Sequence, residues 1–362
     1  MSTLSFDAPL TITGPECKCT PAFAPGVYDY ATFFSRLVIK ALRPDDSGVP
    51  WPIEHAATGA QYWFDKIIGT GSQGTVLQYK LRTSKPMSFV PPLFCLKMTT
   101  LRDDALALEV LAVTAPEVAV PFRTVRSQIS RFDYVAMPAY DGDLIDLVQR
   151  HTPNFIRPDQ AGWIMCKVLE QIAALDRHGL SYMDVKCENI LYSSCGNPPA
   201  EVYVQLGDLG SVSHKDSVQR KMVLCTYPPP EHADLAGGPV PQDPACCLWA
   251  TGLMFLAIMG FTDATNPELS FNVNGMRALY LFYVEEGFDA KAAKSALRIS
   301  NCNKVQTWLK REGLERLLPY VTALMGTAQA PSTTSIQQAY QLFCGAHKRP
   351  RIESRTEGHH PH

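Results

Sequence analysis

The spacing of hydrophobic residues along the chain changes near residue 140. From Trp63 onward, short apolar runs separated by glycine, proline and polar residues predict antiparallel strands at about 64–68, 75–81, 93–98 and 132–137. Leucines at 101, 106, 108 and 111 predict one helix over residues 101–115. After Gly142 the spacing becomes helical, and its clearest segment, Ala161–His178, is followed by Gly179 as a C-terminal cap. The pattern predicts a small β-rich part and then a larger, mainly helical part that extends to residue 346.

One long stretch carries no charged residue. It extends from Pro244 to Thr262 and is close to the length that spans a bilayer. Its proline, paired cysteines and glycines disfavour a membrane span, and a fully buried helix in a large core has the same composition. We therefore expect a buried helix and no contact with a membrane.

The two ends differ in composition from the middle. Residues 1–60 are rich in Pro, Thr, Ala and Gly and are interpreted as an extension, with one amphipathic stretch from Tyr28 to Leu42. Cys17 and Cys19 form a C-x-C pair, but no second pair follows at zinc-finger spacing. Residues 347–362 form a basic, histidine-containing tail, either solvated or acting as a nuclear import signal or phosphate-contacting patch. The expected divisions are 1–60 (extension), 61–140 (β-rich lobe), 141–346 (helical lobe) and 347–362 (disordered tail).

Composition narrows the class of protein. The 362 residues are 46% hydrophobic and 10% aromatic, which excludes global disorder. A net charge of -2 argues against nucleic-acid binding through the overall field. The 11 irregularly spaced cysteines do not resemble the framework of a small secreted domain, and the first residues contain no secretory signal. We expect reduced thiols and a cytoplasmic or nuclear location.

Two segments of the β-rich part carry candidate chemistry. Residues 69–76 read Gly-Thr-Gly-Ser-Gln-Gly-Thr-Val, in which glycines let backbone amides approach phosphate oxygens. A glycine-rich hairpin would look the same, whereas a dinucleotide fold would need a helix directly after the glycines. Lys97 lies in an apolar strand and needs an anion, such as Glu109 or a phosphate, unless its head reaches solvent at a sheet edge.

Two further segments carry candidate chemistry in the helical part. Asp184, Lys186 and Asn189 crowd together after a helix end and before an apolar run. Such groups are costly beside apolar residues unless they bind a charged ligand or one another. Asp208 lies between Gly207 and Leu209 after a strand-like run, although an ordinary turn has the same composition.

In this order, the four segments resemble the signature set of eukaryotic-type protein kinases, over about residues 62 to 345. The resemblance implies an α+β, bilobal fold with a small β-rich N-lobe, a larger helical C-lobe, and ATP and Mg²⁺ between them. Lys186 is similar to the serine/threonine branch, and protein substrates are the implied partners. The implied roles are Gly69, Thr70, Gly71, Ser72, Gln73 and Gly74 over the phosphates, Val76 over adenine, Lys97 on the α and β phosphates and held by Glu109, Met137 guarding the back pocket, Asp143 near the ribose, Asp184 as catalytic base, Lys186 at the γ-phosphate, and Asn189 and Asp208 as magnesium ligands.

The sequence departs from the family pattern at several positions of the scaffold. Met183 replaces an arginine that receives a phosphorylated activation loop, so we expect activity without that phosphorylation. The other departures are Cys95 for alanine, Tyr182 for histidine, Leu209 for phenylalanine, Thr226 directly before Tyr227 instead of three residues earlier, Cys247 for a buried aspartate with Asp243 as a candidate replacement, and Ala330-Pro331-Ser332 where the arginine partner of Glu231 is expected.

The expected activity is ATP-dependent phosphorylation of serine and threonine in proteins. A pseudokinase that acts by binding partners is the main alternative, but it has no physical need for the metal-ligand pair. A small-molecule kinase is a second alternative, disfavoured by Lys186 and the Pro-Pro-Glu segment at 229–231. The short Lys97 to Glu109 spacing also resembles rapidly diverging viral kinases. The sequence names neither the substrate nor the oligomeric state.

Overall fold

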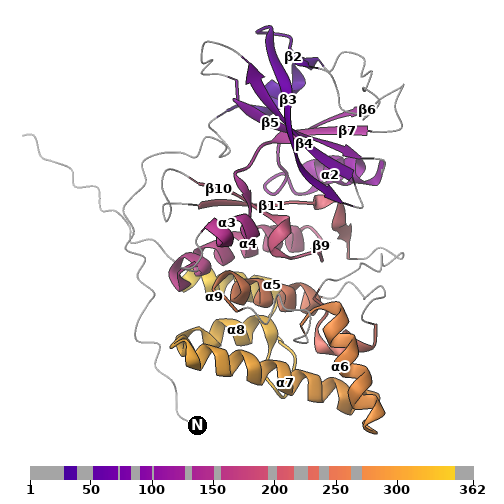
Figure 1. Cartoon of the computed structure of the whole chain (residues 1–362), viewed down its shortest axis with the longest axis vertical. Helices are drawn as coiled ribbons and strands as arrows, with labels where there is room; N and C mark the ends of the chain where they lie inside the picture. The colour runs from indigo at the N-terminus through magenta and orange to yellow at the C-terminus, as the bar shows by residue number, and fades with distance from the viewer. Residues whose placement is uncertain are drawn as a thin grey trace, which may run out of the picture.

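The computed structural model describes residues 28–38, 52–71, 74–82, 90–99, 102–126, 133–150, 156–194, 202–215, 227–235, 244–261 and 271–346. These residues form two lobes, a curled sheet with one long helix and a stack of helices, as Figure 1 shows. The predicted α+β bilobal fold is confirmed.

The N-lobe is built on one antiparallel sheet with strand order β1-β2-β3-β4-β5-β7-β6. Side-chain alternation gives this sheet two different faces. Tyr79, Phe94 and Tyr134 lie on the face that forms the lobe's own core, whereas Val76 and Lys97 lie opposite each other on the face toward the C-lobe. The elements are β1 Leu37–Val38, β2 Ile53–His55, β3 Ala60–Gly71, β4 Gly74–Arg82, β5 Leu93–Thr99, α2 Arg102–Thr114, β6 Arg123–Arg126 and β7 Asp133–Pro138.

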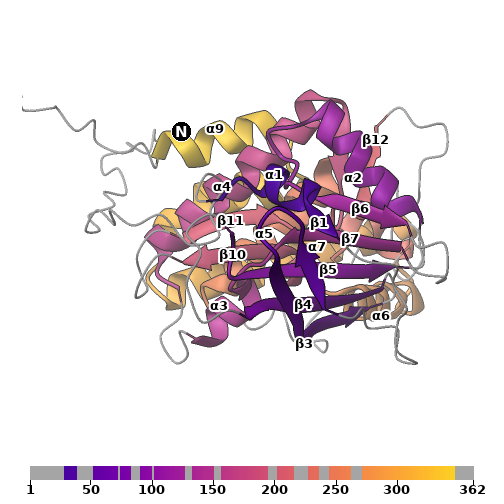
Figure 2. The same cartoon turned by 90° about the horizontal axis from the view of Figure 1, so that it is seen from above.

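Part of the predicted N-terminal extension belongs to this lobe. Helix α1 (Tyr30–Ser35) begins at Asp29, whose carboxylate accepts a bond from Thr32 N at 3.0 Å, and it buries Phe33 and Phe34 against the aromatic core. The guanidinium of Arg123 binds carbonyls at and just after the C-terminal end of the helix, those of Phe34, Ser35 and Leu37, at 2.8, 3.2 and 2.5 Å. Figure 2 shows α1 beside β1 and β6. The boundary expected at residue 60 therefore does not separate an extension from the sheet, because aromatic side chains on both sides of it share one core.

The C-lobe is a stack of helices with short strands along its upper edge. The helices are α3 Leu144–Arg150, α4 Pro158–Arg177, α5 Pro244–Ile258, α6 Val273–Glu285, α7 Ala290–Arg311, α8 Leu318–Met325 and α9 Ile336–Ala346, and the strands are β8 Gly142–Asp143, β9 Leu180–Tyr182, β10 Ile190–Ser194, β11 Val202–Leu206 and β12 Val212–His214. Short 3-10 turns cover Cys187–Asn189, Leu209–Ser211 and Pro230–Leu235.

The uncharged stretch forms α5, which contacts α4 on one side and α8 on another. A Cβ on Gly252 would come within 2.5 Å of Met325 Cγ, so the glycine allows the close approach of α5 to α8. In the part of the chain that the structure describes, no helix is both long and apolar enough to cross a membrane. The prediction of a buried helix is confirmed.

Helices α4 and α9 lie side by side and are joined by a disulfide between Cys166 and Cys344, with 5.5 Å between the Cα atoms. The expectation of reduced thiols is wrong for this pair. The two cysteines are 178 residues apart, so their spacing gave no sign of the pairing. Gln337 adds a second link between these helices, because its amide donates to Ala173 O at 2.7 Å.

Candidate active site

The glycine-rich segment is the hairpin between β3 and β4. Gly69 lies opposite Val76, and Gly71 lies opposite Gly74, while Ser72 and Gln73 fall outside the described residues. Gly74 has φ +142°, and a Cβ there would overlap the carbonyl oxygen of Met98. Only glycine fits this position, because the end of the hairpin lies against the backbone of Met98 and Thr99 at the end of β5. Thr70 also lies in the hairpin, opposite Thr75.

Lys97 points from β5 toward the C-lobe and pairs with Asp208, with 3.1 Å between Nζ and Oδ1. The structure gives it a different partner from the one expected, since Glu109 on α2 accepts a hydrogen bond from Thr124 Oγ1 at 3.0 Å. The lysine side chain is 14% exposed and needs an anion close by. The Asp208 carboxylate supplies that anion across the two lobes.

Asp184 lies after β9, and two neighbours on the same loop hold its carboxylate. Lys186 Nζ donates to Asp184 Oδ2 at 2.8 Å, and Asn189 Nδ2 donates to the same oxygen at 2.7 Å. The Asn189 amide also reaches the Asp184 backbone carbonyl at 2.9 Å, which closes the loop on itself. The other carboxylate oxygen of Asp184 takes no part in these bonds. The carboxylate is therefore fixed in direction and is only 15% exposed.

The loops of Asp184 and Asp208 are joined by backbone and side-chain bonds. Gly207 N donates to Asn189 O at 2.7 Å, and the buried hydroxyl of Tyr182 donates to Gly207 O at 2.8 Å. Asp208 itself has φ +43°, a left-handed conformation that is uncommon for a residue with a side chain. Sequence reasoning treated Tyr182 only as a departure from the family pattern. It missed the contact because the bond joins residues 25 positions apart.

The residues expected around adenine and ribose lie on β7 and at the lobe junction. Met137 lies opposite Cys95, on the sheet face that also carries Lys97. Burial raises the pKa of the Cys95 thiol to about 12, so the side chain is a neutral, apolar group. Asp143 accepts a bond from Asp146 N at 3.0 Å and caps α3, and burial raises the pKa of its carboxyl above the ordinary range.

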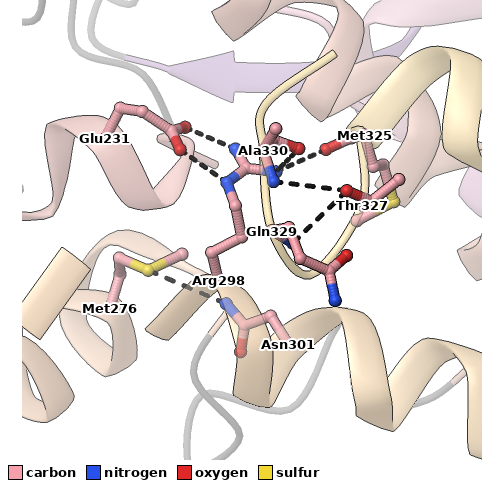
Figure 3. A network of polar contacts seen from close by, with 8 residues as sticks. All are labelled: Glu231, Met276, Arg298, Asn301, Met325, Thr327, Gln329 and Ala330. Atoms are coloured by element: carbon pink, nitrogen blue, oxygen red, sulfur yellow. Dashed lines mark hydrogen bonds and ion pairs between the residues drawn. The ribbon is translucent and has the colours of Figure 1, made fainter. Parts of the chain in front are cut away.

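Glu231 has an arginine partner, which corrects the expectation that this arginine was lost. The partner is Arg298 on α7, not a residue of the 330–332 stretch, and its Nε and Nη2 bind the two Glu231 oxygens at 2.6 and 2.5 Å (Figure 3). Arg298 Nη1 also donates to Met325 O at 2.7 Å and Ala330 O at 3.4 Å. The arginine thus still reaches residue 330, but it comes from a helix instead of from that loop. A spacing argument fails here because the two charges meet only in the folded chain.

Some of the remaining departures from the family pattern lie in the described residues, and others lie outside them. Met183 and Leu209 are buried, 1% and 4% exposed, and Cys247 is a buried residue of α5 close enough to Tyr182 to influence its pKa. A buried methionine offers no charge for a phosphate group. Thr226, Asp243, Cys17, Cys19 and the 347–362 tail lie outside the described residues.

The donor set fits a magnesium ion bound together with phosphates. Asn189 and Asp208 supply amide and carboxylate oxygens, the hard ligands that Mg²⁺ prefers, and Gly207 joins them. Within the described ranges, no group of three or more His, Cys, Asp or Glu side chains forms a complete metal cage. An ion held by two protein oxygens takes its remaining ligands from water and substrate phosphates, as Mg²⁺ commonly does.

A comparison with protein-family models agrees with this geometry. The model described as the protein kinase domain matches residues 62–292, which is well over half of the chain. The matched range contains the glycine-rich hairpin, Lys97, Asp184 and Asp208. A domain of this kind is a phosphotransferase that acts on proteins. The chain belongs to the protein kinase family.

Proposed function

We propose that this protein is an active, ATP- and magnesium-dependent serine/threonine kinase. One observation carries the proposal: a continuous series of contacts runs from Lys97 through Asp208, Gly207 and Asn189 to Asp184. It brings together a cation for phosphate, two metal-ligand oxygens and a candidate base. Phosphoryl transfer depends on positioning and charge neutralisation, and this arrangement supplies both.

Each residue of the site has a defined task in the proposal. Asp184 orients the substrate hydroxyl and accepts its proton, and Asn189 and Lys186 fix the direction of its carboxylate. Lys186 also places a positive charge beside the transferred phosphate. Lys97 binds the α and β phosphates, and Asn189 and Asp208 hold the metal. Magnesium, when bound, neutralises charge on the β and γ phosphates.

The glycine-rich hairpin and the β5–β7 face complete the nucleotide site. Gly69 to Gly74, with Thr70, Gly71, Ser72 and Gln73, cover the phosphates, while Val76 and Met137 enclose adenine and Asp143 binds the ribose. Lys186 supports the serine/threonine assignment because the resemblance places a lysine there in that branch. The buried Met183 supports activity that needs no phosphorylated activation loop.

The test is phosphate transfer from labelled ATP to generic protein substrates by wild type and Asp184→Asn. Asp234→Asn is the matched control, because Asp234 is 36% exposed and pairs with Lys294 on α7 at 2.8 Å. We expect labelled serine and threonine from the wild type and the control, and a loss of at least about 100-fold from Asp184→Asn. Equal labelling by wild type and Asp184→Asn would refute the catalytic role. Labelled tyrosine would refute the serine/threonine assignment, and ATP binding without transfer would favour the pseudokinase.

A further inference from the structure

Tyr182 is a fully buried tyrosine whose hydroxyl lies at the centre of the site. It ends β9, is 1% exposed, and donates its hydroxyl hydrogen to Gly207 O at 2.8 Å. Its side chain also interacts with that of Asn189. A tyrosine hydroxyl is protonated at neutral pH, so this group is a hydrogen-bond donor there. One hydroxyl therefore contacts both loops that carry the candidate magnesium ligands.

The carbonyl that Tyr182 binds is the one directly before Asp208. A peptide group is planar, so fixing the Gly207 carbonyl also fixes the plane that contains the Asp208 amide nitrogen. Asp208 then leaves this plane with φ +43° and ψ +51°, and it is the one residue other than glycine with positive φ among those described. Such a conformation persists only where the surroundings hold it. The hydroxyl of Tyr182 holds the carbonyl of the Gly207–Asp208 peptide, and the Gly207 N to Asn189 O bond holds the peptide directly before it.

The direction of the Asp208 carboxylate depends on this backbone conformation. In the left-handed conformation the carboxylate reaches Lys97 Nζ at 3.1 Å. Without the hydroxyl, the Gly207–Asp208 peptide loses the bond to its carbonyl and can rotate toward a commoner φ. Rotation would turn the carboxylate away from Lys97.

We propose that Tyr182 is a positioning residue that sets magnesium affinity by fixing the peptide before Asp208. The inference rests on the proposed function, since it concerns the same metal site. Tyr182 touches neither phosphate nor metal in this scheme and acts through Asp208. Outer partners of metal ligands of this kind commonly change metal affinity by 10-fold to 100-fold when they are removed.

The chain offers a matched control in Tyr192. This tyrosine is also 1% exposed and lies in the same core cluster, on β10, but its buried hydroxyl has no hydrogen-bond partner in the described structure. Tyr182→Phe and Tyr192→Phe remove the same atom from the same kind of surroundings. Only the first change removes a bond to the peptide of the metal loop.

The experiment measures ATP affinity by titration calorimetry, once with saturating Mg²⁺ and once with EDTA. We expect Tyr182→Phe to weaken ATP binding about 10-fold with Mg²⁺ and less than twofold in EDTA. Tyr192→Phe should stay within twofold of wild type in both conditions. In transfer assays, Tyr182→Phe should raise the Mg²⁺ concentration needed for half-maximal rate and leave the KM for protein substrate unchanged.

Tyr182→His is a second variant, because an imidazole retains a donor in place of the hydroxyl. Its ATP affinity in Mg²⁺ should lie between those of wild type and Tyr182→Phe. Equal weakening by both Tyr182 variants would mean that ring packing, not the donor, matters, and would overturn the inference. A loss of ATP affinity in Tyr182→Phe that is the same in Mg²⁺ and in EDTA would also overturn the inference.

If wild type binds Mg²⁺ with ATP and transfers phosphate while Tyr182→Phe matches it, the inference fails and the proposed function stands. If wild type gains nothing from Mg²⁺, both fail.

Discussion

The ion pair between Glu231 and Arg298 offers a direct test of how the C-lobe is held together. The Arg298 side chain is 5% exposed and donates to both Glu231 oxygens and to two backbone carbonyls, while its guanidinium carbon lies 5.4 Å from the centre of the Trp249 ring. Arg298→Met removes all of these bonds and leaves a carboxylate without its partner. Breaking a buried pair in this way lowers the free energy of unfolding by about 3–5 kcal/mol.

The partial exposure of Glu231 narrows the range of destabilisation expected from Arg298→Met. Glu231 is 35% exposed, so water can hydrate part of the carboxylate once the arginine is gone, and we expect about 3 kcal/mol. Glu231→Gln should cost less, about 1–2 kcal/mol, because Arg298 keeps its bonds to Met325 O and Ala330 O and the amide can still accept one bond. The double variant should cost less than the sum of the two single changes, since each removes the other's partner.

The assay is unfolding in urea followed by tryptophan fluorescence. Arg311→Met is the matched control, because Arg311 lies on the same helix and pairs with Glu312 while 71% exposed, a setting worth at most about 1 kcal/mol. If Arg298→Met is no more destabilising than Arg311→Met, the buried pair does not anchor Glu231. If the double variant loses as much free energy of unfolding as the two single variants together, the pairing of Glu231 with Arg298 is refuted.

Three further predictions concern charge, regulation and the disulfide. Asp143→Asn keeps the helix cap but removes a carboxyl whose pKa burial raises, so the variant should be at least as stable as wild type at pH 7. The difference in stability should vanish as acid protonates the wild-type carboxyl toward pH 4. Melting curves across this pH range check the prediction, and a variant less stable than wild type at pH 7 contradicts it. Phosphatase treatment should leave most activity intact because Met183 offers no charge to a phosphorylated loop, and loss of activity would disprove this. Dithiothreitol should lower the melting temperature of wild type but not of Cys344→Ser, because the disulfide contributes about 2–4 kcal/mol; equal effects on both chains would refute it.

Local patterns predicted much of the fold and much of the site. Strand alternation placed β4, β5 and β7, helical spacing placed α2 and α4, and an uncharged stretch of helical length placed α5, because these elements each bury one face or all faces against a neighbour. The motif residues Lys97, Asp184 and Asp208 were identified because each motif is short and contiguous. The partner of Lys97 was not identified, since Asp208 lies 111 residues away and Glu109 was closer in sequence.

The amino-acid sequence by itself determined the two-lobed division, the candidate catalytic residues and the buried, uncharged α5, because periodicity and short motifs are local properties. Only the tertiary structure decided which partners these residues have. It placed α1 in the N-lobe core, joined Cys166 to Cys344, supplied Arg298 to Glu231 from another helix, and put the hydroxyl of Tyr182 under the carbonyl before Asp208. Each of these contacts joins residues that lie far apart in the chain, to pair a charge, to satisfy a polar group, to bury an aromatic ring or to form a disulfide. No spacing rule along the sequence encodes such a contact.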